Sequence, residues 1–212
     1  MAEQRYLYVM ISHTGTGVGR LIRGISRYRF NHVSLTLDPT FRKWYSFARI
    51  NRNVALYGGF IEESAERYFA FGTDVPVKIF KLPISEKKYA HLTDLFAKAG
   101  TLDNELVYNF FDILAAIVGW QVKIPGAYTC LGFCCTVIEH DFKNIRELEA
   151  AMGEYVFHDG NLAELVSDSG SREDRYFSRL RFPCTFLAPL KNFAVLCSRI
   201  FDRDYNDIVI PK

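Results

Sequence analysis

The sequence lacks a strong excess of either charge. Its 212 residues carry 26 Lys and Arg against 24 Asp and Glu, which gives a formal net charge of +2. Because nucleic-acid-binding proteins usually show a basic bias or a basic stripe, we expect no nucleic-acid partner. One local cluster of arginines favours a solvated helix face, with a patch for an anionic headgroup or phosphate as the alternative: Arg20, Arg23, Arg27 and Arg29.

Long hydrophobic runs are also missing. The most apolar stretch, residues 110–120, contains Asp112 and is shorter than the roughly 20 residues that a membrane-spanning helix needs. The first fifteen residues have neither the basic start nor the apolar core of an export signal. We therefore expect a cytoplasmic protein without an integral membrane segment. The sequence carries no signal for an oligomeric state.

The cysteines show no disulfide or metal pattern. An odd number of cysteines without an export signal does not indicate a disulfide framework. Their spacing also lacks the paired C-x2-C pattern of zinc sites. We expect reduced thiols, no bound metal and no cofactor. The five residues are Cys130, Cys134, Cys135, Cys184 and Cys197.

Hydrophobic periodicity predicts a mixed chain, with apolar residues making up 49% of it, enough for a sizeable core. Strands are expected at 6–12, 31–37, 43–49 and 75–82. Helices are expected at 18–25, from Ser85 to just before Gly100, and at 108–118, 130–140 and 145–152. Residues 50–74 are expected to form a long loop with a short helix at 62–68, residues 161–175 a surface loop, and residues 184–200 a strand pair or a packed tail. This order predicts an α+β fold.

Cys130 is the candidate nucleophile. It follows the Pro125-Gly126 turn and precedes an apolar stripe, so we expect it in the first turn of a buried helix. There the helix dipole and the free backbone N–H groups favour a thiolate and can hold a developing oxyanion. Cys134 and Cys135 lie one turn further along, where burial raises the pKa of a thiol, and we expect them to be core residues.

His32 is the candidate base. It opens the strand predicted at 31–37, on the polar face with Ser34 and Thr36, and opposite an aliphatic face, so we expect this strand to be half-buried. His140 closes the Cys130 helix and would lie about 15 Å from its start, too far to act as the base. A lone histidine in a strand is more often structural, but the cysteine at a helix start favours a catalytic pair.

A glycine-rich run lies between the first strand and the first helix. Gly15, Gly17 and Gly19 match neither the Walker A spacing nor the dinucleotide-binding spacing. We therefore do not expect a nucleotide site. The run, together with His13 at its start, could instead line the cleft beside His32.

Three short motifs resemble one enzyme group. Residues 31–37 (NHVSLTL), 44–47 (WYSF) and 128–133 (YTCLGF) look like the histidine strand, its hairpin return strand and the cysteine helix of the circularly permuted NlpC/P60 group, which includes the lecithin:retinol-acyltransferase-like enzymes. Residues 108–110 resemble its upstream aromatic-Asn element. The resemblance covers about residues 6–166. It implies a papain-like α+β fold, with an antiparallel sheet packed against helices, a catalytic domain at 1–166 and a C-terminal extension at 167–212 packed on it.

The resemblance also implies an activity. A cysteine-dependent hydrolase or acyl-transferase would use Cys130 and His32 on an amide, peptide or (thio)ester bond of a small-molecule, peptide or lipid-like substrate. Enzymes of this group often carry a third polar residue on the return strand that orients the histidine, and Ser46 matches its position. Glu62 or Glu63 could supply a carboxylate for this role instead, and we choose Glu62 as the candidate. The residues expected to contact substrate are Tyr45, Tyr108, Tyr128 and His13. The alternative is a catalytically weak or inactive papain-like ligand-binding module.

Overall fold

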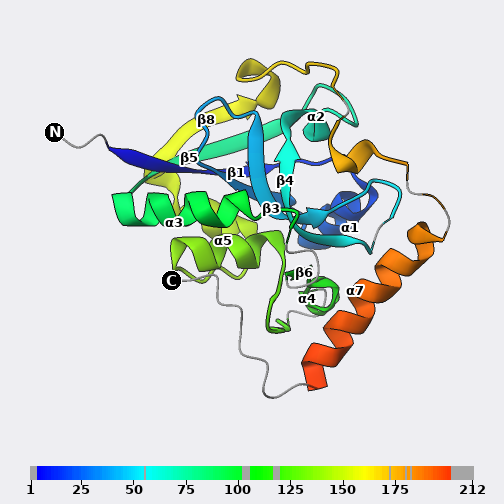
Figure 1. The fold of residues 1–212 in the computed structure, drawn as a ribbon. Coiled ribbons are helices and arrows are strands. Elements are labelled where there is room, and N and C mark those ends of the chain that lie inside the picture. Colours follow the sequence, from blue (N-terminus) through cyan, green and yellow to red (C-terminus); the bar gives the residue numbers. More distant parts are fainter. Residues whose placement is uncertain are drawn as a thin grey trace.

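An eight-stranded sheet forms the centre of the protein (Figure 1). The computed structural model describes residues 4–54, 56–101, 106–116, 120–171, 173–179, 181 and 183–201. The strands are antiparallel, apart from the short parallel pair β6–β7 at one edge. In the order β7-β6-β4-β3-β2-β1-β5-β8, they are Ala127–Tyr128, Val107–Tyr108, Gly58–Ser64, Lys43–Arg49, His32–Thr36, Arg5–Ser12, Pro76–Ile84 and Val156–Asn161.

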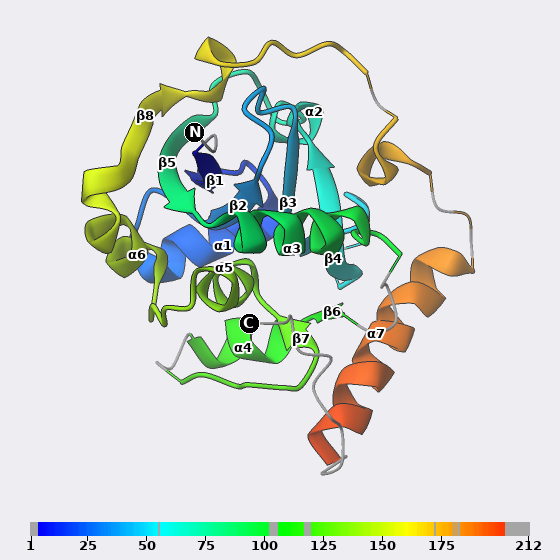
Figure 2. The same ribbon diagram turned by 60° about the vertical axis from the view of Figure 1, so that its left-hand side comes forward.

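Helices cover this sheet, which makes the chain α+β as predicted. The helices are α1 Gly17–Ser26, α2 Ala65–Tyr68, α3 Glu86–Ala97, α4 Phe110–Ala116, α5 Cys130–Ile138, α6 Ile145–Ala151 and α7 Cys184–Phe201. Ser85 caps α3, as its sequence position predicts, because its hydroxyl accepts a hydrogen bond from the Lys88 amide. Figure 2 shows α3 and α5 side by side against the sheet, with α7 on the outside of the molecule.

Apolar side chains are buried on both faces of the sheet. Phe133 of α5 packs against Phe47 and Phe60 on one face. Trp44 and Met10 belong to a second cluster on the other face, together with Tyr68 of α2. The strand β2 is therefore buried throughout, and the prediction that it is half-buried was wrong. Its polar residues face a covered interior, where each needs a hydrogen-bond partner.

The sequence analysis did not predict the strands β4 and β8, and it left residues 184–200 as a strand pair or a packed tail. Residues 50–74 contain the strand β4, whose opening pair Gly58-Gly59 has low strand propensity. A Cβ atom at Gly58 would lie 2.9 Å from the Cβ of Tyr108, so close packing explains this glycine. The strand β8 lies partly in a polar segment. Residues 184–201 form a helix rather than a strand pair, and it places polar residues on its packed face, which hides the usual amphipathic pattern.

Other predicted elements agree within a few residues. The helix predicted at 108–118 begins at Phe110 and is described as far as Ala116; its last two predicted residues lie outside the described part of the chain. The helix of Cys130 ends at Ile138, so His140 falls just beyond it. The helix predicted at 18–25 is α1, and the side chains of its apolar residues lie outside the described part of the structure: Val18, Leu21, Ile22 and Ile25.

The C-terminal segment contacts the sheet region at several points. Asp174 accepts a hydrogen bond from the Ser64 amide, and Tyr176 is buried. Leu196 of α7 is buried near β6. The division of the chain at residue 166 stays a prediction. Among the described residues, no helix is both long and apolar enough to cross a bilayer.

Replacing Phe133 by alanine should destabilise the fold strongly. Phe133 is 1% exposed and contacts the rings of Phe47 and Phe60, so its loss leaves a cavity that costs about 3–5 kcal/mol of unfolding free energy. Phe186→Ala is the matched control. Phe186 is 62% exposed, and we expect a change within about 0.5 kcal/mol. Urea unfolding measures both, and equal losses would contradict this account of the core.

Candidate active site

Cys130 opens α5 immediately after the short strand β7. The turn before it carries Pro125 and Gly126, and Gly126 has the positive φ of 63° that favours glycine. The Ala127 amide donates to the Ile124 carbonyl at 3.0 Å and closes this turn. Cys130 is 8% exposed and occupies the helix start that the sequence predicts.

The first turn of α5 leaves backbone donors beside the sulfur. The Gly132 amide donates to the Thr129 hydroxyl at 3.1 Å, and the Phe133 amide donates to the Thr129 carbonyl at 3.0 Å. The amides of Cys130 and Leu131 are the remaining donors of this turn, because the first N–H groups of a helix have no carbonyl partner within it. These two groups point along the positive end of the helix dipole.

His32 opens β2 and lies beside Cys130. Its ring is 9% exposed, and its backbone pairs with Ser12 of β1. The ring atom Nε2 lies 2.9 Å from Glu63 Oε1. The Cys130 side chain is close enough to favour the protonated ring. The structure thus brings His32 and Cys130, almost a hundred residues apart in sequence, into one site.

Glu63 is the centre of a buried hydrogen-bond network. Its Oε1 accepts hydrogen bonds from the hydroxyls of Ser46 at 2.5 Å, Ser34 at 3.1 Å and Tyr68 at 3.1 Å. The hydroxyls of Ser34 and Tyr68 lie 2.6 Å apart. Arg67 Nε is 4.0 Å from Glu63 Oε2. An ionised carboxylate accepts but cannot donate, so Nε2 of His32 carries the proton that joins the two residues.

The two groups shift each other's pKa in opposite directions. Burial disfavours the charged imidazole, but the charge of Glu63 and the hydrogen bond with Cys130 outweigh it and raise the pKa of His32 to about 10. Burial likewise disfavours the Glu63 carboxylate. The charge and hydrogen bond of His32, followed by the charge of Arg67, outweigh it and lower the pKa of Glu63 to about 2.

Glu63, rather than Glu62, is the carboxylate beside His32. In the β3–β4 register, Trp44 pairs with Glu63 and Tyr45 pairs with Glu62, so the two glutamates point to opposite faces. Glu62 accepts a hydrogen bond from the Tyr45 hydroxyl and forms an ion pair with Lys43. The prediction of Glu62 as the carboxylate beside His32 was therefore wrong, and the alternative, Glu63, lies there. Ser46 does lie in the network, with its hydroxyl 3.4 Å from His32 Nε2.

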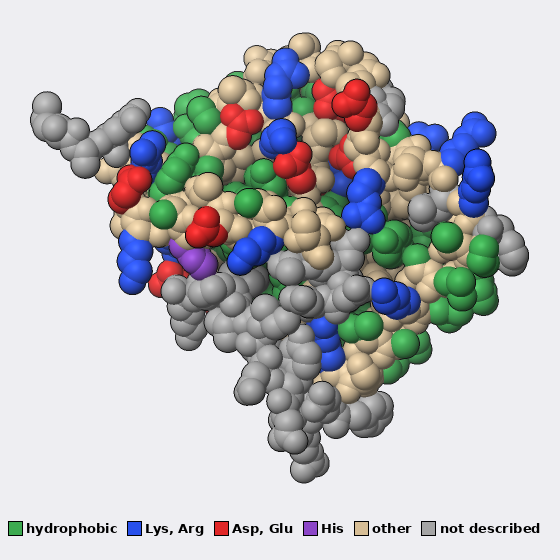
Figure 3. Space-filling model, in the orientation of Figure 1, with side chains coloured by type: hydrophobic (Ala, Val, Ile, Leu, Met, Phe, Trp, Pro, Cys, Tyr) green, Lys and Arg blue, Asp and Glu red, His purple; other side chains and the backbone are tan. Residues whose placement is uncertain are grey.

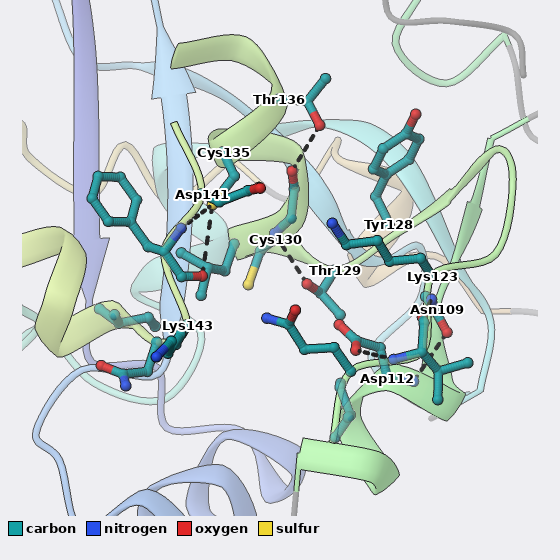
Figure 4. A pocket seen from close by; sticks show the side chains of 18 of the residues that line it. Asn109, Asp112, Lys123, Tyr128, Thr129, Cys130, Cys135, Thr136, Asp141 and Lys143 are labelled. Atoms are coloured by element: carbon teal, nitrogen blue, oxygen red, sulfur yellow. Dashed lines mark hydrogen bonds between the residues drawn. The ribbon is translucent and has the colours of Figure 1, made fainter. Parts of the chain in front are cut away.

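A cavity of about 1280 Å³ opens beside the sulfur of Cys130. Figure 4 shows the sulfur pointing into it from the start of α5. Tyr108 and Tyr128, two of the predicted substrate contacts, line it. Tyr45 and His13 are not among its described lining residues: the Tyr45 ring is stacked 4.3 Å from Phe96, and the His13 amide donates to the Pro76 carbonyl.

Hydrogen bonds join three residues that line this cavity: Asn109, Asp112 and Val122. The Asn109 amide side chain donates to the Val122 carbonyl at 2.6 Å and accepts from the Asp112 amide. The Asp112 carboxylate in turn accepts from the Val122 amide at 2.9 Å. Asn109, which belongs to the aromatic-Asn element, therefore fixes the loop after α4 against the site.

The other cysteines on α5 are core residues, as predicted. Burial raises the pKa of both the Cys134 and the Cys135 thiols. Cys135 also accepts a hydrogen bond from the Phe142 amide at 3.3 Å. Among the described residues, no group of three or more His, Cys, Asp and Glu side chains is arranged to hold a metal ion.

The glycine-rich run contacts Asn31, the residue before His32. Asn31 accepts from the Thr14 amide and from Arg23 Nη1, and it donates to the Thr14 hydroxyl. A Cβ atom at Gly19 would lie 2.3 Å from the Asn31 amide nitrogen, so this glycine makes room for a packing contact. Arg23 is thus tied to this loop, while Arg20 and Arg27 are exposed.

No protein-family model, curated protein or solved structure matches this chain.

The His32–Glu63 pair should make stability depend on pH in a defined window. The raised pKa of His32 stabilises the fold below about 6.5, and this contribution is lost as the pH rises toward about 10. The lowered pKa of Glu63 stabilises the fold above about 4.5, and this contribution is lost as the pH falls toward about 2. The pair therefore contributes most between about pH 4.5 and 6.5.

Urea unfolding across this pH range tests the pair. We expect Glu63→Gln to flatten the profile between pH 6.5 and 10, because the neutral amide no longer favours the imidazolium. Glu62→Gln removes the same charge from the exposed neighbour and should retain the slope of the wild type. A slope that survives Glu63→Gln unchanged would show that another group produces it.

Proposed function

We propose that this protein is a cysteine-dependent hydrolase or acyl-transferase with a papain-like fold of the permuted NlpC/P60 type. The observation that carries the proposal is the position of His32 between the Glu63 carboxylate and the Cys130 thiol. Covalent catalysis uses this arrangement, in which a nucleophile contacts a base and the base contacts an orienting group. The motifs at residues 31–37, 44–47 and 128–133 support the same group.

The proton positions follow from the hydrogen bonds. Glu63 holds Nε2 of His32, which leaves Nδ1 to exchange a proton with Cys130. Because Glu63 favours the imidazolium, the pair is suited to an ion pair between the Cys130 thiolate and His32. His32 itself, followed by Arg67 and the Ser46 hydroxyl, keeps Glu63 ionised, so Glu63 acts as a positioning residue rather than as a proton donor.

The reaction then proceeds in two steps. The sulfur of Cys130 attacks the carbonyl carbon, and the bond to the leaving group breaks as His32 gives that group its proton. A thioester remains on Cys130. Water, or an amine or hydroxyl acceptor, loses a proton to His32 as it attacks the thioester, and the thiolate leaves. The amides of Cys130 and Leu131 would hold the developing oxyanion.

The cavity indicates the kind of acyl group that would reach the sulfur. Its walls combine aromatic and aliphatic side chains with scattered polar ones, and its volume suits a peptide or lipid-like substrate. Tyr108 and Tyr128 are among its aromatic lining residues. The choice between hydrolysis and transfer depends on whether water or an acceptor enters after the thioester forms.

One observation favours a ligand-binding module without efficient chemistry. Cys130 and His32 are both about nine-tenths buried, so a substrate carbonyl has restricted access to the sulfur. A papain-like fold of this kind could hold a ligand in the cavity while turning it over slowly. The reactivity of the thiol distinguishes the two functions.

Iodoacetamide labelling near neutral pH tests the proposed pair. We expect stoichiometric alkylation of Cys130, located by peptide mass spectrometry, at a rate well above that of the buried Cys134. His32→Ala should slow this labelling by at least about tenfold, because a neutral thiol reacts far less readily than a thiolate. Glu63→Gln should slow it as well, whereas Glu62→Gln should not. Exposed Cys184 provides an internal reference.

Uniform slow labelling of all five cysteines would support the binding module instead. For an active enzyme, panels of γ-glutamyl peptides and thioesters give the substrate class. Cys130→Ser should abolish turnover in either panel. Adding a primary amine to the assay separates transfer from hydrolysis, because only a transferase diverts the acyl group to the amine.

A further inference from the structure

Helix α7 places polar residues on its packed face. The Asn192 side chain is buried and donates to the Gly58 carbonyl at 2.7 Å. Arg199 is also buried and donates from Nη1 to the carbonyls of Pro125 at 3.2 Å and Gly126 at 2.9 Å. Leu196 lies between them in the same contact surface. Hydrogen bonds to backbone carbonyls thus help to attach the helix to the rest of the protein, together with the buried Leu196.

The opposite face of α7 is apolar and exposed. Five large side chains on it are between 48% and 62% exposed: Phe186, Leu187, Leu190, Phe193 and Ile200. Three of them recur every seventh residue, which keeps them on one side of the helix. A helix that faced only water would have the reverse distribution, with apolar residues inside and polar residues outside. This exposed face therefore fits an apolar environment.

The apolar surface extends beyond α7. The ring of Phe193 lies 5.7 Å from the ring of Phe111 in α4. Leu114, one turn further along α4, is also exposed. Figure 3 shows hydrophobic side chains gathered over α7, with Lys and Arg beside them and the acidic side chains of this view elsewhere. Exposed apolar patches of this kind mark sites of protein or membrane contact.

The charges around α7 indicate whether this face binds a protein or a membrane. From residue 175 to residue 201 the sequence contains basic residues and no Asp or Glu. Four of these basic residues are exposed: Arg175, Arg179, Arg181 and Lys191. Pairing two copies of this face would bring these basic residues together, and the stretch from 175 to 201 offers no Asp or Glu to lie between them. An anionic lipid surface would bind the basic residues and the apolar face at once.

We propose that α7 docks this protein onto anionic lipid membranes. The helix lies in the plane of the interface, with its apolar face among the acyl chains and its basic residues at the headgroups. This binding goes beyond the proposed activity and does not require it. Vesicle binding can therefore fail while thiol reactivity persists, and the reverse also holds.

Co-sedimentation of the full-length protein with vesicles tests this proposal. We expect partition onto phosphatidylcholine–phosphatidylglycerol vesicles to exceed partition onto pure phosphatidylcholine vesicles, and to weaken as salt rises. Leu187→Glu with Leu190→Glu should reduce partition by at least about tenfold. The control, Tyr155→Glu with Val156→Glu, makes the same charge change at exposed apolar positions at and next to β8, the opposite edge of the sheet from β6 and β7.

Two further measurements complete the test. Arg181→Gln with Lys191→Gln should weaken partition onto the anionic vesicles alone, and Cys130→Ser should bind like the wild type. Equal partition of the Leu187/Leu190 variant and its control would overturn the proposal. So would a dimer in analytical ultracentrifugation that this variant dissociates, in the absence of vesicle binding, because the face would then be an interface between copies of the chain.

Discussion

The contact between His32 and Glu63 is the interaction on which the site depends. A carboxylate so far from solvent is costly unless its lone pairs and its charge are matched. The match comes from four separate elements: His32 and Ser34 of β2, Ser46 of β3, Glu63 itself on β4, and Arg67 and Tyr68 of α2. The order of three neighbouring strands is therefore tied to the protonation of one histidine.

Arg67 connects this network with the C-terminal segment. Besides its contact with Glu63, its guanidinium lies 3.6 Å from Asp174 and 4.4 Å from the ring centre of Tyr176, and it donates to the Arg49 carbonyl. Residues 174–176 thus help to set the position of a cation that favours ionised Glu63. The segment after residue 166 contributes to the electrostatics of the site, whatever its status as a separate unit.

Local sequence patterns located Cys130 and His32 but not Glu63. The turn at Pro125-Gly126 and the apolar stripe after Cys130 determine a helix start from nearby residues, and the alternation at residues 31–37 likewise locates His32. Glu63 could not be chosen over Glu62 in this way, because the choice depends on the register between β3 and β4. Residues distant in sequence meet at this strand pair: a Cβ atom at Gly58 would lie 2.9 Å from the Cβ of Tyr108, a contact that sequence alone does not display. The fold class needed only the element order, whereas residues 184–200 were left as a strand pair or a packed tail because the inward residues of α7 include Asn192 and Arg199.

The carbonyls that Arg199 binds belong to the turn that delivers the chain to Cys130. Arg199, near the C-terminal end of α7, thus binds the carbonyls of Pro125 and Gly126. These two residues form the turn that precedes α5. A shift of α7 along its axis would remove the Arg199 donor from both carbonyls, of which the Gly126 carbonyl also accepts from the Val107 amide at 3.0 Å. A displacement of α7 would therefore act on a turn that lies only four residues before Cys130.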